Sequence, residues 1–272
     1  MPSLWQGLVI SAAAFGGGMM NSVAGGGTLL TFPALIWMGI DPKVANVTST
    51  VALWPGSLGA MFGFRRELAG SRRWMIVLGP ASVLGGLVGA ILLLQTPSRT
   101  FAAIVPYLIL FATLLFAAGE PLTRMLRRKR IESSQHGPIQ SGDAEQIAAP
   151  DSTSWAGAAT LQFFSSVYGG YFGAGNGIIM LAGMTLFGLT DIHQMNGLKN
   201  FFAVCINVIA SAYFILSGAL NDSWAIALVM TVSAIAGGYV GAGLARRSGR
   251  RAVRRAVVVI GIAMALSLFL RG

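Results

Sequence analysis

The sequence predicts an all-α polytopic membrane protein built from two inverted repeats of about five helical segments each. Of the 272 residues, 54% are hydrophobic and only 10% are charged, whereas a soluble domain carries about 25% charged residues. Several apolar stretches approach or exceed the roughly 20 residues needed to cross the hydrocarbon core of a bilayer. The two halves of the chain also repeat the same unusual residues in the same order. An ordinary soluble domain is therefore excluded.

Five apolar segments precede a polar interruption, and five more follow it. The first group covers residues 5–24, 28–40, 44–64, 73–94 and 100–119, and the second covers 155–173, 178–190, 194–216, 224–245 and 252–270. Between them, residues 120–154 hold a basic run and then a stretch rich in Ser, Gln, Gly, Asp and Pro, which cannot bury apolar surface. We expect a membrane repeat over residues 1–120, a flexible cytoplasmic loop over 121–154, and a second membrane repeat over 155–272.

The two groups correspond at a nearly constant offset of 150 residues. The matches pair Gly25 with Gly175, Gly27 with Gly177, Asp41 with Asp191, Asn46 with Asn196, and Trp74 with Trp224. A glycine motif at residues 85–90 recurs at 237–242, where the offset has grown to 152. The shared order of Asp, Asn and Trp indicates a duplication.

The distribution of positive charge predicts the orientation of the segments, because cytoplasmic loops of membrane proteins carry an excess of Lys and Arg. The 65–72 loop, the 124–130 run and residues 246–255 are rich in arginine, whereas the 217–223 loop has no basic residue. The 65–72 loop and its counterpart 217–223 should then lie on opposite sides, so the halves are inverted. We expect both termini outside a bacterial cytoplasmic (inner) membrane, and the net charge of +10 indicates cytoplasmic loops and no nucleic-acid partner.

Two short segments, 28–40 and 178–190, each follow a glycine-rich break, at residues 24–28 and 173–177. Paired, glycine-interrupted short segments indicate the substrate site of a transporter with inverted repeats. Such a break exposes backbone N–H groups at a helix N-terminus, where the partial positive charge favours an anion. Close helix packing is the alternative role for these glycines. The sequence leaves open whether the short segments cross or re-enter the membrane.

Polar residues mark one face of the third segment in each half. They are Asn196, Lys199, Asn200 and Asn207 in the second half, and Asn46, Ser49, Thr50 and Ser57 at the matching positions of the first. Polar groups are costly against lipid, so both faces should meet a cavity or the protein interior. Hydrogen bonding between helices is the alternative role.

Lys199 is the most informative of these residues. An ammonium group within a membrane helix is costly unless it meets an anion, reaches the cytoplasmic surface, or pairs with an acid such as Asp191. Asp41 and Asp191 themselves precede helices and are expected to be N-caps. The expected substrate-binding residues are Gly25, Gly26, Gly27, Thr28, Asn46, Ser49, Thr50, Gly175, Asn176, Gly177, Asn196, Lys199 and Asn200. Further candidate donors beside the breaks are Asn21, Gln162, Tyr168 and Tyr171.

The sequence contains no signature of an enzyme. It has no His, Cys and carboxylate cluster with metal-ligand spacing, and no nucleophile beside a credible base. The run Gly25-Gly26-Gly27-Thr28 lacks the lysine and the spacing of a phosphate-binding P-loop. We therefore expect no catalytic residue, no metal and no cofactor.

The residues around the breaks form motifs that extend over much of the chain. These motifs are residues 24–35 (AGGGTLLTFPAL), 39–42 (GIDP), 45–50 (ANVTST), 169–177 (GGYFGAGNG) and 196–200 (NGLKN). With them the chain resembles the TauE/SafE family, the sulfite exporter or organosulfonate permease family of membrane transporters, over nearly its whole length apart from residues 124–154.

The resemblance implies export of a small sulfur-containing anion, such as sulfite, sulfoacetate or a related sulfonate, with this anion and the lipid bilayer as partners. An anion channel, and a secondary transporter of another organic anion such as a carboxylate, are the alternatives. The sequence leaves the coupling ion and the oligomeric state open, a homodimer among the options.

Overall fold

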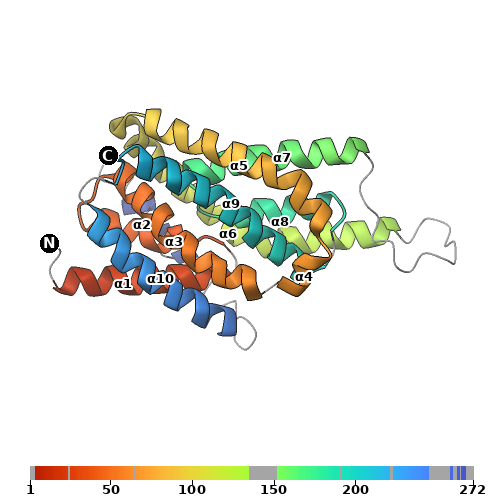
Figure 1. Cartoon of the computed structure of the whole chain (residues 1–272), viewed down its shortest axis with the longest axis horizontal. Helices are drawn as coiled ribbons and strands as arrows, with labels where there is room; N and C mark the ends of the chain where they lie inside the picture. Colours follow the sequence, from red (N-terminus) through yellow and green to blue (C-terminus); the bar gives the residue numbers. More distant parts are fainter. Residues whose placement is uncertain are drawn as a thin grey trace.

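The structure is a computed structural model, and it describes residues 4–23, 25–63, 65–134, 152–189, 191–220 and 223–244, with short pieces at 258–259, 262–263 and 265–267. Within these residues the chain is all-helical, as the sequence predicts. Figure 1 shows the helices running mostly along the long axis of the molecule. They are α1 (Leu4–Val23), α2 (Thr28–Trp37), α3 (Pro42–Gly63), α4 (Arg65–Ala69), α5 (Arg72–Gln95), α6 (Ser98–Ser134), α7 (Ser152–Tyr171), α8 (Asn176–Leu186), α9 (Ile192–Leu216) and α10 (Trp224–Leu244).

Four of the described helices are long and apolar enough to cross a membrane. The four spans are Arg72–Gln95, Ser98–Ala118, Ile192–Leu216 and Trp224–Gly241. The helices α2 and α8 are apolar but have only 10 and 11 residues. A polytopic membrane protein with short second segments, as expected, is therefore confirmed.

The segment boundaries differ from the prediction mainly in the central loop. Helix α6 continues through the basic run as far as Ser134, so residues 121–134 are helical and not a flexible loop. The reason is local, because Leu, Met, Arg and Lys, which fill this stretch, are good helix formers. Residues 135–151 lie outside the described residues, as does most of the last predicted segment, 252–270.

Two helix pairs pack closely through glycine, α1 with α10 and α5 with α7. A Cβ atom on Gly241 would lie 2.6 Å from Cα of Met19, and one on Gly89 would collide with the backbone oxygen of Val167. Gly89 and Gly241 are partners in the repeated glycine motif. Glycine here lets helix backbones approach, which provides much of the packing between helices in a bilayer.

The two pairs mix helices from the two halves of the chain. One bundle combines α1, α2 and α3 with α10, and the other combines α7, α8 and α9 with α5. The halves 1–120 and 155–272 are therefore not separate packing units, although each bundle has the same arrangement of helices. The arrangement is the one expected of the predicted repeat, which itself stays a prediction.

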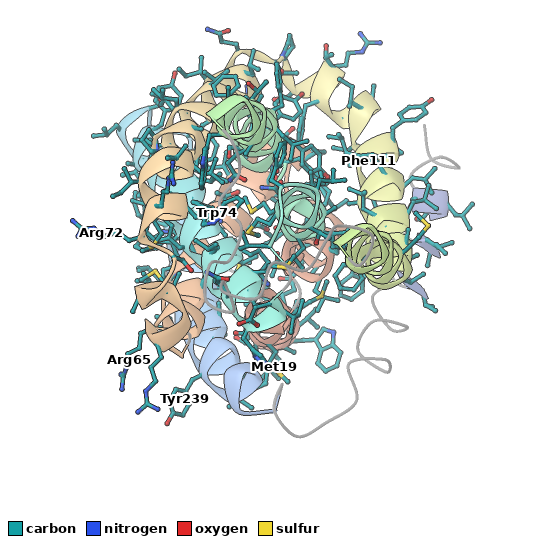
Figure 2. All side chains as sticks on the ribbon, turned by 90° about the vertical axis from the view of Figure 1, so that its right-hand side faces the viewer. Met19, Arg65, Arg72, Trp74, Phe111 and Tyr239 are labelled. Carbon is teal, nitrogen blue, oxygen red and sulfur yellow. The ribbon has the colours of Figure 1, made fainter. Side chains whose placement is uncertain are left out.

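The basic segments α4 and the end of α6 lie toward the same end of the molecule, the right-hand end in Figure 1. Figure 2 looks at that end and shows the side chains of Arg65 and Arg72 pointing away from the bundle. At the opposite end, Lys43 donates from Nζ to the carbonyl oxygens of Leu94 (2.6 Å) and Thr96 (2.8 Å). Lys43 thus satisfies carbonyls at the C-terminal end of α5.

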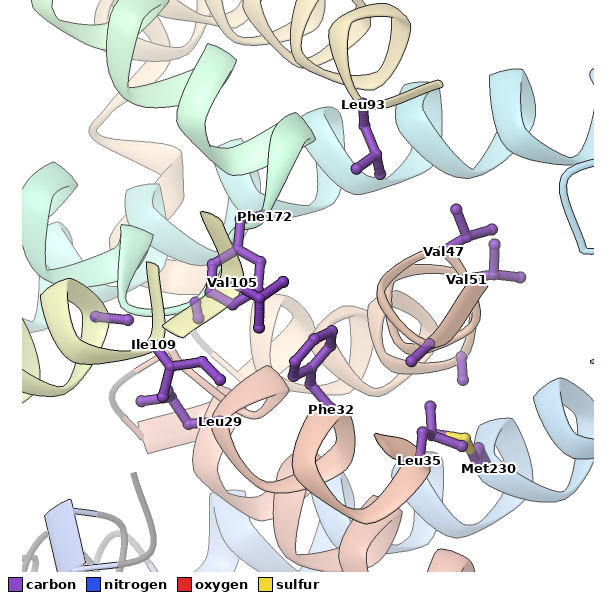
Figure 3. Packing of buried hydrophobic residues seen from close by; sticks show 14 of the residues in the cluster. Leu29, Phe32, Leu35, Val47, Val51, Leu93, Val105, Ile109, Phe172 and Met230 are labelled. Carbon is purple, nitrogen blue, oxygen red and sulfur yellow. The ribbon is translucent and has the colours of Figure 1, made fainter. Parts of the chain in front are cut away.

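A buried apolar cluster holds α2 against the second half of the chain. Figure 3 shows Phe32 of α2 facing Phe172, which directly follows α7, with Val105 of α6 beside them. The rings of Phe32 and Phe172 meet edge to face, with centroids 5.5 Å apart. This packing fixes the position of the break that precedes α2 relative to the break that precedes α8.

Candidate functional site

The two glycine breaks share a left-handed glycine at corresponding positions and touch each other. Gly25 has φ +68° and Gly175 has φ +76°, a left-handed region that favours glycine. A Cβ atom on Gly25 would lie 3.3 Å from Cα of Gly177. The breaks, distant in sequence, are therefore in contact at the centre of the fold.

The helices after the breaks extend toward opposite ends of the molecule. Figure 1 places α2 toward the left-hand end and α8 toward the right-hand end. At 1.5 Å per residue, each helix is about 15 Å long, roughly half of a hydrocarbon core of about 30 Å. The N-termini of α2 and α8 consequently meet near half the depth of the helix bundle. Both N-termini carry partial positive charge.

A cavity of about 50 Å³ lies where the breaks meet. Holding one water needs about 10–15 Å³ on the same scale, so there is room for a few waters or a small anion. The lining residues come from both bundles: Asn21, Gly25, Gly26, Thr28, Thr50, Leu53, Ser57, Gly169, Phe172, Gly173, Asn176, Gly177, Met180, Lys199, Asn200, Ala203, Ile206 and Asn207.

The polar faces of α3 and α9 supply matching positions to this cavity. Three pairs at the offset of 150 line it together: Thr50 with Asn200, Leu53 with Ala203, and Ser57 with Asn207. Lys199 lines it too, but its counterpart Ser49 does not. The two halves therefore contribute corresponding positions of α3 and α9 to the cavity, but only the second half contributes a charged residue from these helices.

Lys199 and Asn200 are both almost completely buried, each with 1% of its surface exposed. Within the described part of the chain, Asn200 Nδ2 has no hydrogen-bond partner. A buried donor without a partner is costly, so the site favours a ligand that can accept a hydrogen bond.

Of the residues expected to bind substrate, Gly25, Gly26, Thr28, Thr50, Asn176, Gly177, Lys199 and Asn200 line the cavity, whereas Gly27, Asn46, Ser49, Gly175 and Asn196 are not among its lining residues. Asn46 instead donates from Nδ2 to the carbonyl oxygen of Tyr171 at 2.8 Å, so it satisfies the C-terminal end of α7. Asn196 donates to the carbonyl oxygen of Ile192 in its own helix. These two side chains have structural roles.

The first break differs from the expectation that its amides are unsatisfied. Asn21 Oδ1 accepts hydrogen bonds from the backbone N–H groups of Gly27 (2.8 Å) and Gly26 (3.1 Å). A side-chain acceptor at this place is favourable because the first N–H groups of a helix have no partner within the helix.

Of the other candidate donors beside the breaks, none lines the cavity. Tyr168 donates from its hydroxyl to the carbonyl oxygen of Ala174 (2.6 Å), which braces the second break. Gln162 donates to the hydroxyl oxygen of Ser82 (2.9 Å), between α7 and α5. The hydroxyl of Tyr171 lies 3.4 Å from that of Thr96. These three side chains therefore hold helices and breaks in place.

Sequence reasoning missed the apolar part of the lining, which includes Leu53, Phe172, Met180, Ala203 and Ile206. Helical spacing provides the missing signal for some of them, because Leu53 follows Thr50 by three residues and Ala203 follows Asn200 by three.

The expected N-caps are confirmed. Asp191 accepts from the backbone N–H of His193 (2.8 Å), and Asp41 accepts from that of Lys43 (2.9 Å).

A bundle of apolar helices, with two broken segments meeting at a buried polar cavity, defines a membrane transporter. The sequence profile described as "Sulfite exporter TauE/SafE" matches residues 10–268. The chain belongs to the TauE/SafE family.

Relatives with similar sequences are named as transporters. A "Probable membrane transporter protein" of Haemophilus influenzae is 28% identical over 261 residues, covering 94% of this chain and 91% of the relative. "Probable membrane transporter protein ORF9" of a Sinorhizobium species is 25% identical, covering 94% of this chain and 89% of the relative. "Probable membrane transporter protein YfcA" of Escherichia coli is 25% identical, covering 92% and 85%.

Proposed function

We propose that this transporter moves a small oxyanion of the sulfite or organosulfonate type, by alternating access at the cavity between the two glycine breaks. The contact between Gly25 and Gly177, beside the buried Lys199, is the observation that supports this most directly. The description of the family, which names sulfite, supports the substrate class.

The chemistry of the lining suits an oxyanion. Lys199 supplies a positive charge, and Asn200 supplies a buried hydrogen-bond donor. The hydroxyl groups of Thr28 and Ser57, from the first half of the chain, are further donors, whereas the hydroxyl of Thr50 donates to the carbonyl oxygen of Asn46 in its own helix (2.9 Å). Together with the N-terminal ends of α2 and α8, these groups replace part of the hydration shell that an anion loses when it enters.

Export is the direction that the membrane potential assists. A potential that is negative inside drives an anion outward by about 2.3 kcal/mol per charge per 100 mV. An exporter of this kind can therefore run downhill, with the arginine-rich ends of the helices in the cytoplasm.

The test is uptake and release by the purified protein in proteoliposomes, with a panel of sulfite, thiosulfate, sulfoacetate, taurine, sulfate and carboxylates. We expect saturable flux of a sulfur oxyanion, and a decrease of at least about 10-fold in Lys199→Ala, because one charge-assisted contact is worth about 1.5–3 kcal/mol. Lys43→Ala is the matched control, since Lys43 bonds to the end of α5 and its loss should leave the flux unchanged.

Two results would replace the proposal by its alternatives. Electrical conductance that does not saturate with anion concentration would identify a channel. Flux of carboxylates alone would identify a transporter of another organic anion. Equal sulfur-anion flux in Lys199→Ala and the unmodified protein would remove the role of this charge.

A further inference from the structure

Asn21 has its carbonyl oxygen already engaged, which fixes the orientation of its side-chain amide. Two backbone N–H groups, those of Gly26 and Gly27, approach the same atom of Asn21 at 3.1 and 2.8 Å. Both are donors, so this atom must be the oxygen. Asn21 also lines the cavity, and its Nδ2 group is the polar group left for a ligand.

Asn176 is in the same situation on the other side of the contact between the breaks. Its Oδ1 accepts a hydrogen bond from Ser165 Oγ at 2.7 Å, and its side chain is buried, with 6% exposed. Its Nδ2 lies over Gly169, where an added Cβ atom would approach it to 2.5 Å. Both Asn176 and Gly169 line the cavity, so a second amide donor belongs to its wall.

The two asparagines do not correspond to each other in the repeat. At the offset of 150, Asn21 matches Tyr171, and Asn176 matches Gly26. Each half nevertheless contributes one carboxamide next to its own break, from the end of α1 in the first half and from the start of α8 in the second. The chemistry at the two sides of the cavity is thus similar although the positions differ.

We infer that Asn21 and Asn176 form a pair of carboxamide ligands that hold one oxyanion from two sides, with their Nδ2 groups as donors. The inference rests on the proposed function. It adds Asn21 to the binding residues, and it makes the break itself sensitive to the ligand, because the group that holds Gly26 and Gly27 also contacts the anion. It further defines the ligand class as a compact anion with at least two acceptor oxygens.

The test replaces the Nδ2 donor of Asn21 by an acceptor and keeps the hydrogen bonds that Asn21 accepts from Gly26 and Gly27. In Asn21→Asp, a carboxylate oxygen can still accept from Gly26 and Gly27 at the start of a helix, where negative charge is favourable. The Nδ2 donor is replaced by a negatively charged oxygen facing the cavity. Binding is measured on the purified full chain as the thermal shift and the Kd for sulfite and for sulfoacetate. Gln194→Glu is the matched control, because Gln194 donates to Ser71 away from the cavity.

We expect Asn21→Asp without ligand to melt within a few degrees of the unmodified protein. We expect it to bind the anion about 10- to 100-fold more weakly. Gln194→Glu should keep the affinity of the unmodified protein. If Asn21 only braces the break, Asn21→Asp will bind as tightly as the unmodified protein, and the inference is wrong. Should Asn21→Asp not fold, Asn176→Asp makes the same exchange opposite Ser165, and unchanged affinity there contradicts the pair. Absence of binding by the unmodified protein would instead contradict the proposed function.

Discussion

A single buried lysine sets the electrostatics of the cavity. On insertion scales an ammonium group at the centre of a membrane helix costs about 2.5–3.5 kcal/mol, and Lys199 is 1% exposed. Its counterpart Ser49 is neutral. An anion in the cavity would therefore be held more strongly by the second half of the chain than by the first.

Gly25 at the first break combines a left-handed backbone with a close contact to Gly177, and substitutions can separate the effects of these two features. Gly25→Ala meets a left-handed backbone (φ +68°) and a close neighbour, Gly177, inside the cavity region. Gly39→Ala meets a left-handed backbone (φ +81°) with nothing within 4 Å. We expect both variants to lose about 1–2 kcal/mol of stability, and only Gly25→Ala to lose anion binding. Thermal unfolding with and without sulfite measures both, and equal binding in the two variants would contradict a role for the contact between the breaks.

The sequence predicts individual site residues well where chemistry and spacing agree, and less well where a side chain is used by the fold. Lys199 and Asn200 were predictable because a cation and an amide on an apolar helix need a polar environment. Asn46 follows the same pattern, yet it bonds to the end of α7, a helix 125 residues away in sequence. Only the tertiary structure reveals such a partner. For Asn21 the sequence suggests a donor to the anion, but not its bond to the break.

At the scale of elements, glycine allows the paired helices to approach each other closely. The contacts of Gly89 with α7 and of Gly241 with α1 involve backbone atoms, which cannot move aside as a flexible side chain can. Gly7 of α1, in contrast, has nothing within 4 Å of an added Cβ atom. Some helical glycines therefore contact the backbone of a neighbouring helix, whereas others face open space.

We expect Gly89→Ala and Gly241→Ala to destabilise the protein by similar amounts, about 1–3 kcal/mol each, because one methyl group forces each helix pair apart. Gly7→Ala should be neutral or slightly stabilising. Size-exclusion chromatography after heating, with a fluorescent fusion, compares the three variants. A large difference between Gly89→Ala and Gly241→Ala would argue against equivalent roles of these glycines in the two halves.

Helix boundaries were predictable to within a few residues for the apolar segments, because length and hydropathy define them. The continuation of α6 to Ser134 was not, since charge marks where a helix leaves the bilayer but not where it ends. The choice of partners, α1 with α10 and α5 with α7, also required the structure. A glycine-rich helix face predicts close packing but does not predict which helix will pack against it.

At the scale of the whole molecule, the orientation in the membrane is a prediction that labelling can test. In a Cys205→Ala background, we expect Arg66→Cys to react with a membrane-impermeant maleimide only when the cytoplasmic side is open. Ser217→Cys should react from outside, because the 217–220 turn lies at the end opposite to α4 in Figure 1. Both positions are exposed, so each is accessible to the reagent. Labelling of both from the same side would contradict the inverted arrangement.

The pairing of α1 with α10 also has a consequence for biogenesis. The ribosome makes about 5–20 residues per second, so α10, which ends at Leu244, is completed roughly 10–45 s after α1. During this interval the side of α1 that meets α10, which includes Gly18 and Met19, is uncovered, although α2 and α3 already pack against another side of α1. Helix α5 waits only until α7 emerges. In nascent chains stopped before residue 224, α1 should therefore be held only by its contacts with α2 and α3.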